Sequence, residues 1–199
     1  MELAPTIFSA GWASGVNAYA TVLLLGILGR AGVGDVPEPL TRDSVLALAA
    51  LMYAIEFVTD KVPYLDNTWD LIHTAIRPAI GSAVGIEFAD LDGASELGGA
   101  AGGGTTALAS HGVKTGLRLA VNISPEPLSN IVVSLLEDMA VAGVVVLALE
   151  NPEIAAVVAA VLLATGIVLV ILLARVIRRS YARWRRQRGG RAPPDPPGG

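Results

Sequence analysis

The sequence contains no cysteine, which excludes disulfide bonds, thiolate nucleophiles and thiolate metal sites. It also contains no Gly-Lys-Ser/Thr phosphate loop, Gly-x-Ser-x-Gly elbow or His-Glu-x-x-His zinc motif, so neither a cofactor nor a common catalytic machinery is expected. Aromatic residues make up only 5% of the chain, although 53% of it is hydrophobic. An apolar chain that is rich in glycine and alanine is typical of closely packed membrane helices.

Basic residues are scarce over most of the chain. Six precede Arg175 against seventeen acids, whereas eight arginines and one acid follow from Arg175 to the end. We therefore expect an integral membrane helical domain over 1–178 and a basic, Pro/Gly-rich, disordered cytoplasmic tail over 179–199. The tail is predicted to bind anionic lipid headgroups. Because the positive charge is local, no nucleic acid is expected as a partner.

The fold class follows from the hydrophobic segments. Residues 154–174 form an uncharged stretch of 21 residues, long enough to cross a hydrocarbon layer of ~30 Å as a helix. Five further segments are apolar but carry polar residues: 7–29, 44–62, 69–88, 97–121 and 128–149. The sequence therefore predicts an all-α, polytopic bundle of about six transmembrane helices.

Two features predict irregularity within these segments. Pro78 removes a backbone hydrogen bond, so a kink or break is expected after Arg77. The glycine run at 98–104 indicates close helix contact or a broken helix, and a flexible linker is the alternative. Similar helix ends and acid pairs in the two halves indicate a weak 3+3 inverted pseudo-repeat, which needs a gap to align.

Six crossings place both termini on the same side of a membrane. The arginine-rich tail predicts that this side is the cytoplasm, because short cytoplasmic loops carry the excess of Lys and Arg. The connections at 87–97 and 150–153 are acidic and are expected outside.

A basic stripe raises the question of function. His111, Lys114, Arg118 and Asn122 follow each other at three, four and four residues, which places them on one helix face. A charge at the bilayer centre costs from ~2.5 to more than 10 kcal/mol, so such groups should face each other or a wet cavity. The partners predicted for Lys114 and Arg118 are the acids Glu56, Asp60, Glu137 and Asp138.

The candidate substrate- or ion-binding residues are the polar groups of these segments: Asn17, Glu56, Asp60, Asp70, His73, Arg77, His111, Lys114, Arg118, Asn122, Glu137 and Asp138. The acids would bind a cation or proton, the bases would balance them or hold an anion, and the histidines would relay protons. The plainer interpretation makes the acids structural salt bridges and the histidines neutral hydrogen-bonded groups. It places Asp60, Lys61, Asp66 and Asp70 at the interface and makes Arg118 and Asn122 a helix end. Whether the histidines bind a metal stays open.

Three strings carry a family resemblance: SGVNAY (14–19), EFVTDKVPYLDNTWDLIHTAIRPAIG (56–81) and HGVKTGLRLAVNISPEPLSNIVVSLLEDMAVAG (111–143). Over roughly residues 8–173 the chain resembles small bacterial integral membrane proteins catalogued as domain of unknown function 4126. The resemblance implies a multi-pass protein of the bacterial plasma membrane. It supplies no substrate, cofactor or catalytic residue.

Three functions are compatible with these residues. The first is a transporter or channel-like protein, as a homo-oligomer, with a charge-lined cavity for an ion, a proton-coupled solute or a small anion. The second is a structural or accessory membrane protein whose buried charges are salt bridges and whose tail binds lipid or a partner. The least favoured is a lipid-headgroup enzyme with His111 and Glu137 or Asp138 as base, because no nucleophile stands out.

Overall fold

The computed structural model describes residues 3–62, 64–122 and 127–189. Within these ranges the chain is all-α, with seven α-helices, one short 3₁₀ turn and no strand. In chain order the elements are α1 (Leu3–Val16), α2 (Ala18–Arg30), η1 (Glu38–Thr41), α3 (Asp43–Thr59), α4 (Leu65–Leu91), α5 (Glu96–Val121), α6 (Pro127–Glu150) and α7 (Pro152–Gly189). The all-α class predicted from the hydrophobic segments is confirmed.

The first apolar segment is broken at Asn17. This residue has extended backbone angles (φ −149°, ψ 98°), and its side chain accepts a hydrogen bond from the Ala20 amide at 2.9 Å, which caps α2. The two resulting helices have 14 and 13 residues. At 1.5 Å per residue each is about 20 Å long, too short to cross ~30 Å of hydrocarbon. The prediction of one crossing helix over 7–29 is therefore wrong.

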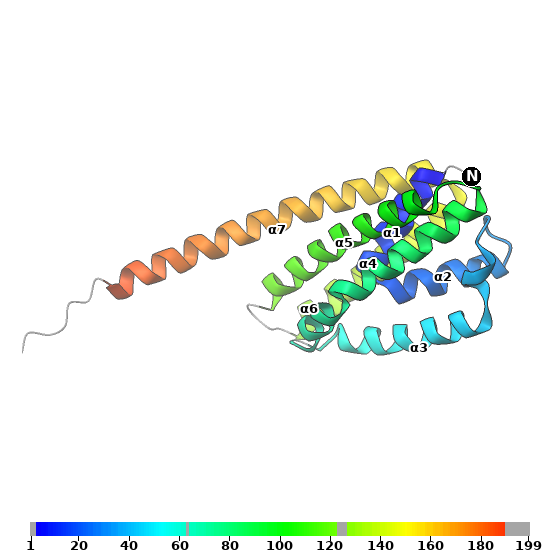
Figure 1. Ribbon diagram of the computed structural model, residues 1–199. Helices are drawn as coiled ribbons and strands as arrows, with labels where there is room; N and C mark the ends of the chain where they lie inside the picture. Colours follow the sequence, from blue (N-terminus) through cyan, green and yellow to red (C-terminus); the bar gives the residue numbers. More distant parts are fainter. Residues whose placement is uncertain (1–2, 63, 123–126, 190–199) are drawn as a thin grey trace, which may run out of the picture.

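The two short helices form a hairpin. In Figure 1, α1 runs from the N-terminal end to the middle of the bundle, and α2 returns toward the same end. The outer ends agree with this, because Leu3 shares a hollow with Ser95 and Gly29 shares another with Leu91, on either side of the α4–α5 turn. The start of α1 and the end of α7 consequently lie at opposite ends of the bundle (Figure 1), which differs from the arrangement expected of six crossing helices.

The breaks expected elsewhere are absent from the described helices. α4 continues through Pro78, and α5 runs unbroken through the glycine run at 98–104. Proline inside a helix is tolerated where neighbouring helices pack around it, and α4 packs on α1 and α5. The 3+3 pseudo-repeat also loses its first match, because the opening segment of the first half is a hairpin whereas α5 is continuous.

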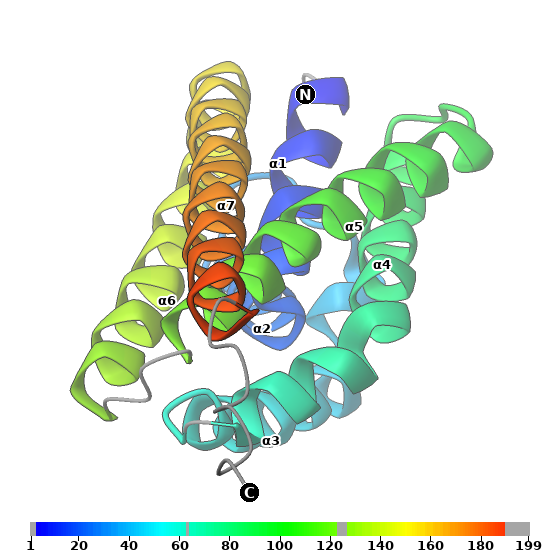
Figure 2. The same ribbon diagram turned by 90° about the vertical axis from the view of Figure 1, so that its left-hand side faces the viewer.

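Glycines bring α1, α4 and α5 into close contact. Each helix contributes a pair spaced four residues apart: Gly11 and Gly15, Gly81 and Gly85, Gly99 and Gly103. A Cβ added at Gly85 would lie 2.1 Å from the Gly99 carbonyl oxygen, and one added at Gly103 would lie 2.1 Å from that of Gly81. Figure 2 shows the three helices side by side. The glycine run therefore marks close helix contact.

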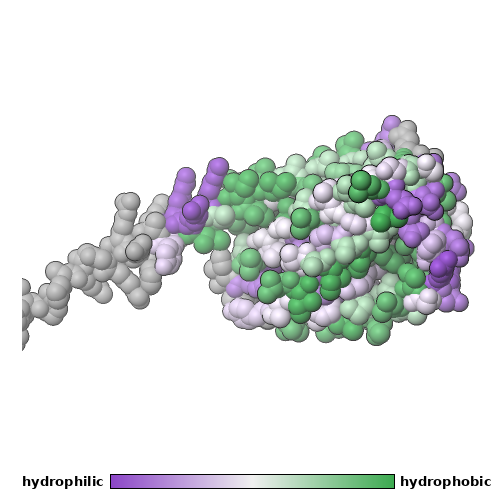
Figure 3. Space-filling view, viewed as in Figure 1, coloured by the Kyte–Doolittle hydropathy of each residue, from purple (hydrophilic) through white to green (hydrophobic). Residues whose placement is uncertain are grey.

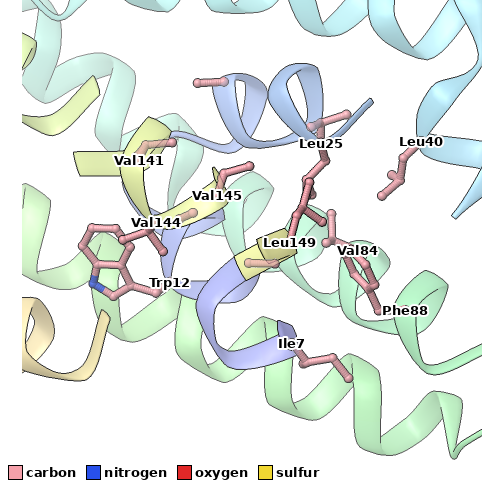
Figure 4. Close-up of a cluster of buried hydrophobic side chains, with 14 of the residues drawn as sticks. Ile7, Trp12, Leu25, Leu40, Val84, Phe88, Val141, Val144, Val145 and Leu149 are labelled. Atoms are coloured by element: carbon pink, nitrogen blue, oxygen red, sulfur yellow. The ribbon is translucent and has the colours of Figure 1, made fainter. Parts of the chain in front are cut away.

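An apolar core fills the junction between the hairpin and α6. Figure 4 shows Trp12 of α1 beside Val141 and Val144 of α6, and Leu25 of α2 close to Leu149. All five side chains are at most 7% exposed. This core fixes the hairpin against the longer helices.

The outer surface of the bundle is strongly apolar. Leu71 is 74% exposed, Met139 71% and Val157 63%. Figure 3 shows apolar side chains along the flank of the bundle and hydrophilic ones gathered at its right-hand end. Exposed apolar patches of this extent mark a surface that meets lipid or another protein.

Of the described helices, two have a segment long and apolar enough to cross a membrane, Leu128–Glu150 and Pro152–Arg179. The other segments predicted to cross fall short for different reasons. α3 has only 17 residues, whereas α4 and α5 have 27 and 26 residues but carry several charged side chains. The length and composition of the described helices thus do not establish the predicted number of about six crossings.

The last helix is longer than expected. α7 has 38 residues and extends well beyond the other helices (Figure 1). Residues 179–189, predicted to belong to the disordered tail, are helical, because arginine and alanine favour helices. The remainder of the predicted tail, 190–199, lies outside the described residues.

Candidate functional site

Charged side chains occupy the interior between α3, α4, α5 and α6. Seven of them are at most 3% exposed: Glu56, Asp60, Asp66, Asp70, Arg77, Lys114 and Arg118. Together with Glu137 and Asp138 of α6 we call them the charge network. Charges leave water only when oppositely charged or hydrogen-bonding partners surround them. In this chain charged side chains are buried and many large apolar ones are exposed, whereas most proteins in water bury apolar side chains and expose charged ones.

Arg118 joins three helices. Its Nη2 donates to Glu137 Oε2 at 2.5 Å, and its Nη1 donates to the Asp60 carbonyl oxygen at 2.6 Å. The guanidinium also forms ion pairs with Asp60 Oδ2 at 3.4 Å and Asp66 Oδ2 at 3.5 Å. Its planar array of donors suits this role, because one guanidinium can serve several acceptors at once.

Lys114 lies one turn earlier on α5. Its Nζ donates to Asp60 Oδ2 at 2.6 Å, to the Val16 carbonyl oxygen at 3.1 Å and to Glu56 Oε1 at 3.5 Å. It also lies 3.6 Å from Glu137 Oε2. The predicted pairing of the α5 bases with these three acids is confirmed.

Asp138, also predicted as a partner of Lys114 and Arg118, forms no hydrogen bond or ion pair with either base. Its Oδ1 instead accepts a hydrogen bond from Asn17 Nδ2 at 3.2 Å. The neighbouring acids of α6 thus serve different partners, in keeping with the ~100° between successive residues of a helix.

Arg77 extends the network to the middle of the bundle. Its Nη2 lies 2.8 Å from Glu56 Oε1 and 3.0 Å from Asp70 Oδ1. Its Nη1 donates to the Gly15 carbonyl oxygen at 3.2 Å and to His111 Nδ1 at 2.9 Å. Because a guanidinium only donates, His111 Nδ1 must accept, which leaves the proton of a neutral imidazole on Nε2.

His73 is hydrogen-bonded on both ring nitrogens. Nδ1 lies 2.8 Å from the Trp69 carbonyl oxygen and therefore carries a proton, while Nε2 faces the Tyr19 hydroxyl at 2.9 Å. The Trp69 ring stacks on the imidazole. Within the described residues, no three His, Asp or Glu side chains are arranged to hold a metal ion. These contacts agree with the plainer interpretation of the histidines.

The break at Asn17 supplies part of the site. The last carbonyl groups of a helix have no partner inside it and carry partial negative charge. At the end of α1 the carbonyls of Gly15 and Val16 accept hydrogen bonds from Arg77 and Lys114. Asn17, predicted within a continuous helix, instead sits where α1 ends and the charge network begins.

Asp66 was expected at the interface, and that expectation is wrong. The side chain is 0% exposed and accepts hydrogen bonds from Asn122 Nδ2 at 2.9 Å, Asn130 Nδ2 at 3.2 Å and the Asn67 amide at 2.7 Å. Asn122 therefore contacts the network through Asp66, and it is also the C-cap residue at which α5 ends, as the plainer interpretation expected.

Sequence reasoning also missed Tyr19, Asn130 and Ser134, which bond to His73, Asp66 and Lys61. The sequence did contain a pattern that indicates the burial of Asp66. Asp66, Asp70, His73 and Arg77 repeat the helical spacing of the α5 stripe, and all four are buried. Lys61 is only half-buried, and its Nζ lies 3.1 Å from the centre of the Phe57 ring. This exposure is compatible with the position at the interface that was expected for it.

The network is unbalanced in charge. Six acids face four bases when all groups are ionised and the half-buried Lys61 at the edge is included: Glu56, Asp60, Asp66, Asp70, Glu137 and Asp138 against Lys61, Arg77, Lys114 and Arg118. Some buried oxygens have neither a hydrogen-bond nor an ion-pair partner among the described residues, including Oδ2 of Asp70 and Oε2 of Glu56. A desolvated surplus of this kind favours binding of protons or a cation.

The sequence suggested that the charged side chains line an open cavity, but they do not. They contact one another directly, and the hollow that reaches Lys114 and Glu137, of about 270 Å³, is lined mostly by apolar side chains. The interior is thus a lattice of ion pairs with an apolar crevice at one side.

The fold and its interior define an all-α bundle with an apolar exterior and a buried charge network. The chain matches the family described as Domain of unknown function (DUF4126) over residues 4–172, and it belongs to that family. No curated protein and no solved structure matches the chain.

Proposed function

We propose that the chain is an integral membrane protein of the bacterial plasma membrane, with five crossing helices (α3 to α7) and a re-entrant hairpin formed by α1 and α2. The exposed apolar flank, the buried charges and the two long apolar helices support this arrangement. The arginine-rich end of α7 marks the cytoplasmic side, and its basic residues bind anionic lipid headgroups. The N-terminal end then lies on the outer side.

Within that membrane, the chain transports protons or a small cation through the charge network, as a homo-oligomer. The observation that carries this proposal is the surplus of carboxylates in the network, in which Oδ2 of Asp70 has no partner although its Oδ1 pairs with Arg77. A cation or proton bound there would restore the balance of charge. Broken helices whose free carbonyls face an ion site recur in transporters, and α1 ends in this way beside Arg77 and Lys114.

The path is closed on the outer side. The network runs from Asp66, close to the α3–α4 turn, to Arg77 beside the break, and beyond the break α1, α4 and α5 pack glycine on glycine. A route across the membrane therefore requires movement of the hairpin against α4 and α5. Such alternating exposure of a central site is the mode of action of secondary transporters.

A structural role is the second candidate. It is favoured by the completeness of the ion pairs, because Arg77, Lys114 and Arg118 each contact at least two carboxylates. In this case the network would fix the positions of α3 to α6 and carry no ion.

Proton flux into liposomes separates these functions. The purified chain is reconstituted, a potassium diffusion potential is imposed, and the internal pH is followed with a trapped dye. Asp70→Asn is expected to reduce flux about tenfold or more, because it removes the negative charge of a buried carboxylate whose Oδ2 has no partner, while preserving the shape of the side chain. Asp90→Asn is the matched control, since Asp90 lies on the same helix but is exposed.

Elution from a sizing column and the thermal midpoint report whether each variant folds. Sodium and potassium flux are measured in the same vesicles. A folded wild-type chain that carries no proton, sodium or potassium would contradict transport and leave the structural role.

A further inference from the structure

An apolar crevice opens beside the charge network. It lies between α1, α5, α6 and α7 and has a volume of about 270 Å³, room for about nine water molecules. Most of its lining is aliphatic, and its polar side chains are Ser110, Lys114, Glu137 and Thr165. The crevice therefore combines an apolar wall with charged groups of the network.

The mouth of the crevice belongs to the apolar exterior. Leu136 is 59% exposed, Leu169 45% and Leu162 37%, and all three line the hollow. In the proposed orientation they face lipid acyl chains. A molecule can thus reach the crevice sideways from the bilayer.

The charge offered to that molecule is negative. The Lys114 ammonium directs its hydrogens to Val16, Asp60 and Glu56. The side chain of Glu137 is 15% exposed, whereas those of Asp60 and Glu56 are 4% and 0% exposed. Glu137 is therefore the carboxylate of this group that the crevice reaches. It already accepts hydrogen bonds from Arg118, but a carboxylate has further acceptor sites, so a cationic head suits it better than an anionic one.

We propose that the crevice binds a lipophilic organic cation, a single-chain alkylammonium, with its chain between α5, α6 and α7 and its ammonium at Glu137. The inference rests on the proposed function and names a substrate class for it. The surplus of negative charge in the network adds to the attraction. The alkyl chain of the bound cation contacts the aliphatic side chains of the crevice, where it replaces the acyl chain of a lipid.

The protein contains its own reporter. Trp12 lines the crevice and is 5% exposed, so its fluorescence responds to an occupant. The full chain carrying Trp69→Phe and Trp184→Phe is placed in nanodiscs and titrated with decylammonium, decanol or decyl sulfate. We expect a saturable change with decylammonium at a concentration at least about tenfold lower than with decanol, and the weakest response with decyl sulfate.

Two variants identify the site. Glu137→Gln is expected to weaken decylammonium binding about tenfold and leave decanol binding unchanged, because only the cation uses the charge. Thr165→Phe fills the crevice without altering the network and should abolish binding of both. Ala164→Phe is the matched control, since Ala164 is the preceding residue and is exposed outside the crevice.

The outcomes are distinguishable from those of the flux experiment. Equal affinity for the three probes, or full binding to Thr165→Phe, would overturn the cation site whether or not protons are transported. Decylammonium binding by a chain that carries no flux would retain the site and remove transport. If both hold, decylammonium should slow proton flux in the wild type but not in Thr165→Phe.

Discussion

Replacement of Arg118 by methionine is expected to lower the free energy of unfolding by about 3–5 kcal/mol. Arg118 is 0% exposed and contacts Asp60, Asp66 and Glu137. Methionine preserves much of the volume but removes every donor, so three carboxylates lose a shared partner inside an apolar bundle. The cost comes mainly from the charges left behind. Denaturant titration of the purified chain in detergent measures it.

Arg42→Met is the matched control for that substitution. Arg42 also pairs with an acid, Glu38 at 3.2 Å, but both side chains are more than half exposed. Water and salt screen such pairs, so the unfolding midpoint should not move. Arg118→Lys should fall between the two, because it keeps the charge and loses the planar array of donors. An Arg118→Met chain as stable as the control would show that the acids of the network are protonated and need no base.

The charge network could largely be predicted from the sequence. The spacing of His111, Lys114 and Arg118 places them on one helix face whatever the tertiary structure, and the cost of charge in lipid requires that partners exist. The acids at matching depth were few, so the pairs with Glu56 and Asp60 followed. Local periodicity and one strong energetic constraint were sufficient here.

The hairpin could not be predicted in the same way. Residues 7–29 are apolar enough and long enough for one crossing, and hydropathy does not distinguish a single helix from two half-length ones. The break depends on distant partners: Ser110 donates to the Trp12 carbonyl oxygen, and Lys114 donates to that of Val16. Because the chain turns back at the hairpin, the start of α1 also lies at the end of the bundle opposite to the end of α7.

Asp66 shows a related limit. It follows Lys-Val-Pro-Tyr-Leu in the sequence, a stretch that indicates a turn, so a position at the interface was the natural expectation. Its burial comes from the amides of Asn122 and Asn130, which are 56 and 64 residues away. Long-range hydrogen bonds of this kind leave no local pattern, although the shared helical spacing with Asp70 was visible.

Substitution of Gly103 by valine is expected to cost more than about 3 kcal/mol, at or above the upper end of the usual range for overpacking. A Cβ at this position would lie 2.1 Å from the Gly81 carbonyl oxygen and 3.3 Å from the Gly85 Cα. Both neighbours are backbone atoms of α4, so no side-chain rotation can relieve the clash. The helices must separate, and α1 must follow because it packs on the same face of α5.

Gly112→Val provides the control on the same helix, because a Cβ there would meet nothing within 4 Å. Its effect should be within about 1 kcal/mol, the range of helix propensity. Separation of α4 from α5 also moves Arg77 relative to His111, so Gly103→Val should disturb the network from a distance. Cysteine pairs placed across the two helices in this cysteine-free chain would report that movement by their rate of crosslinking. If Gly103→Val and Gly112→Val unfold at the same denaturant concentration, the glycine contact does not hold the helices together, and the proposed closure of the outer half would have no structural basis.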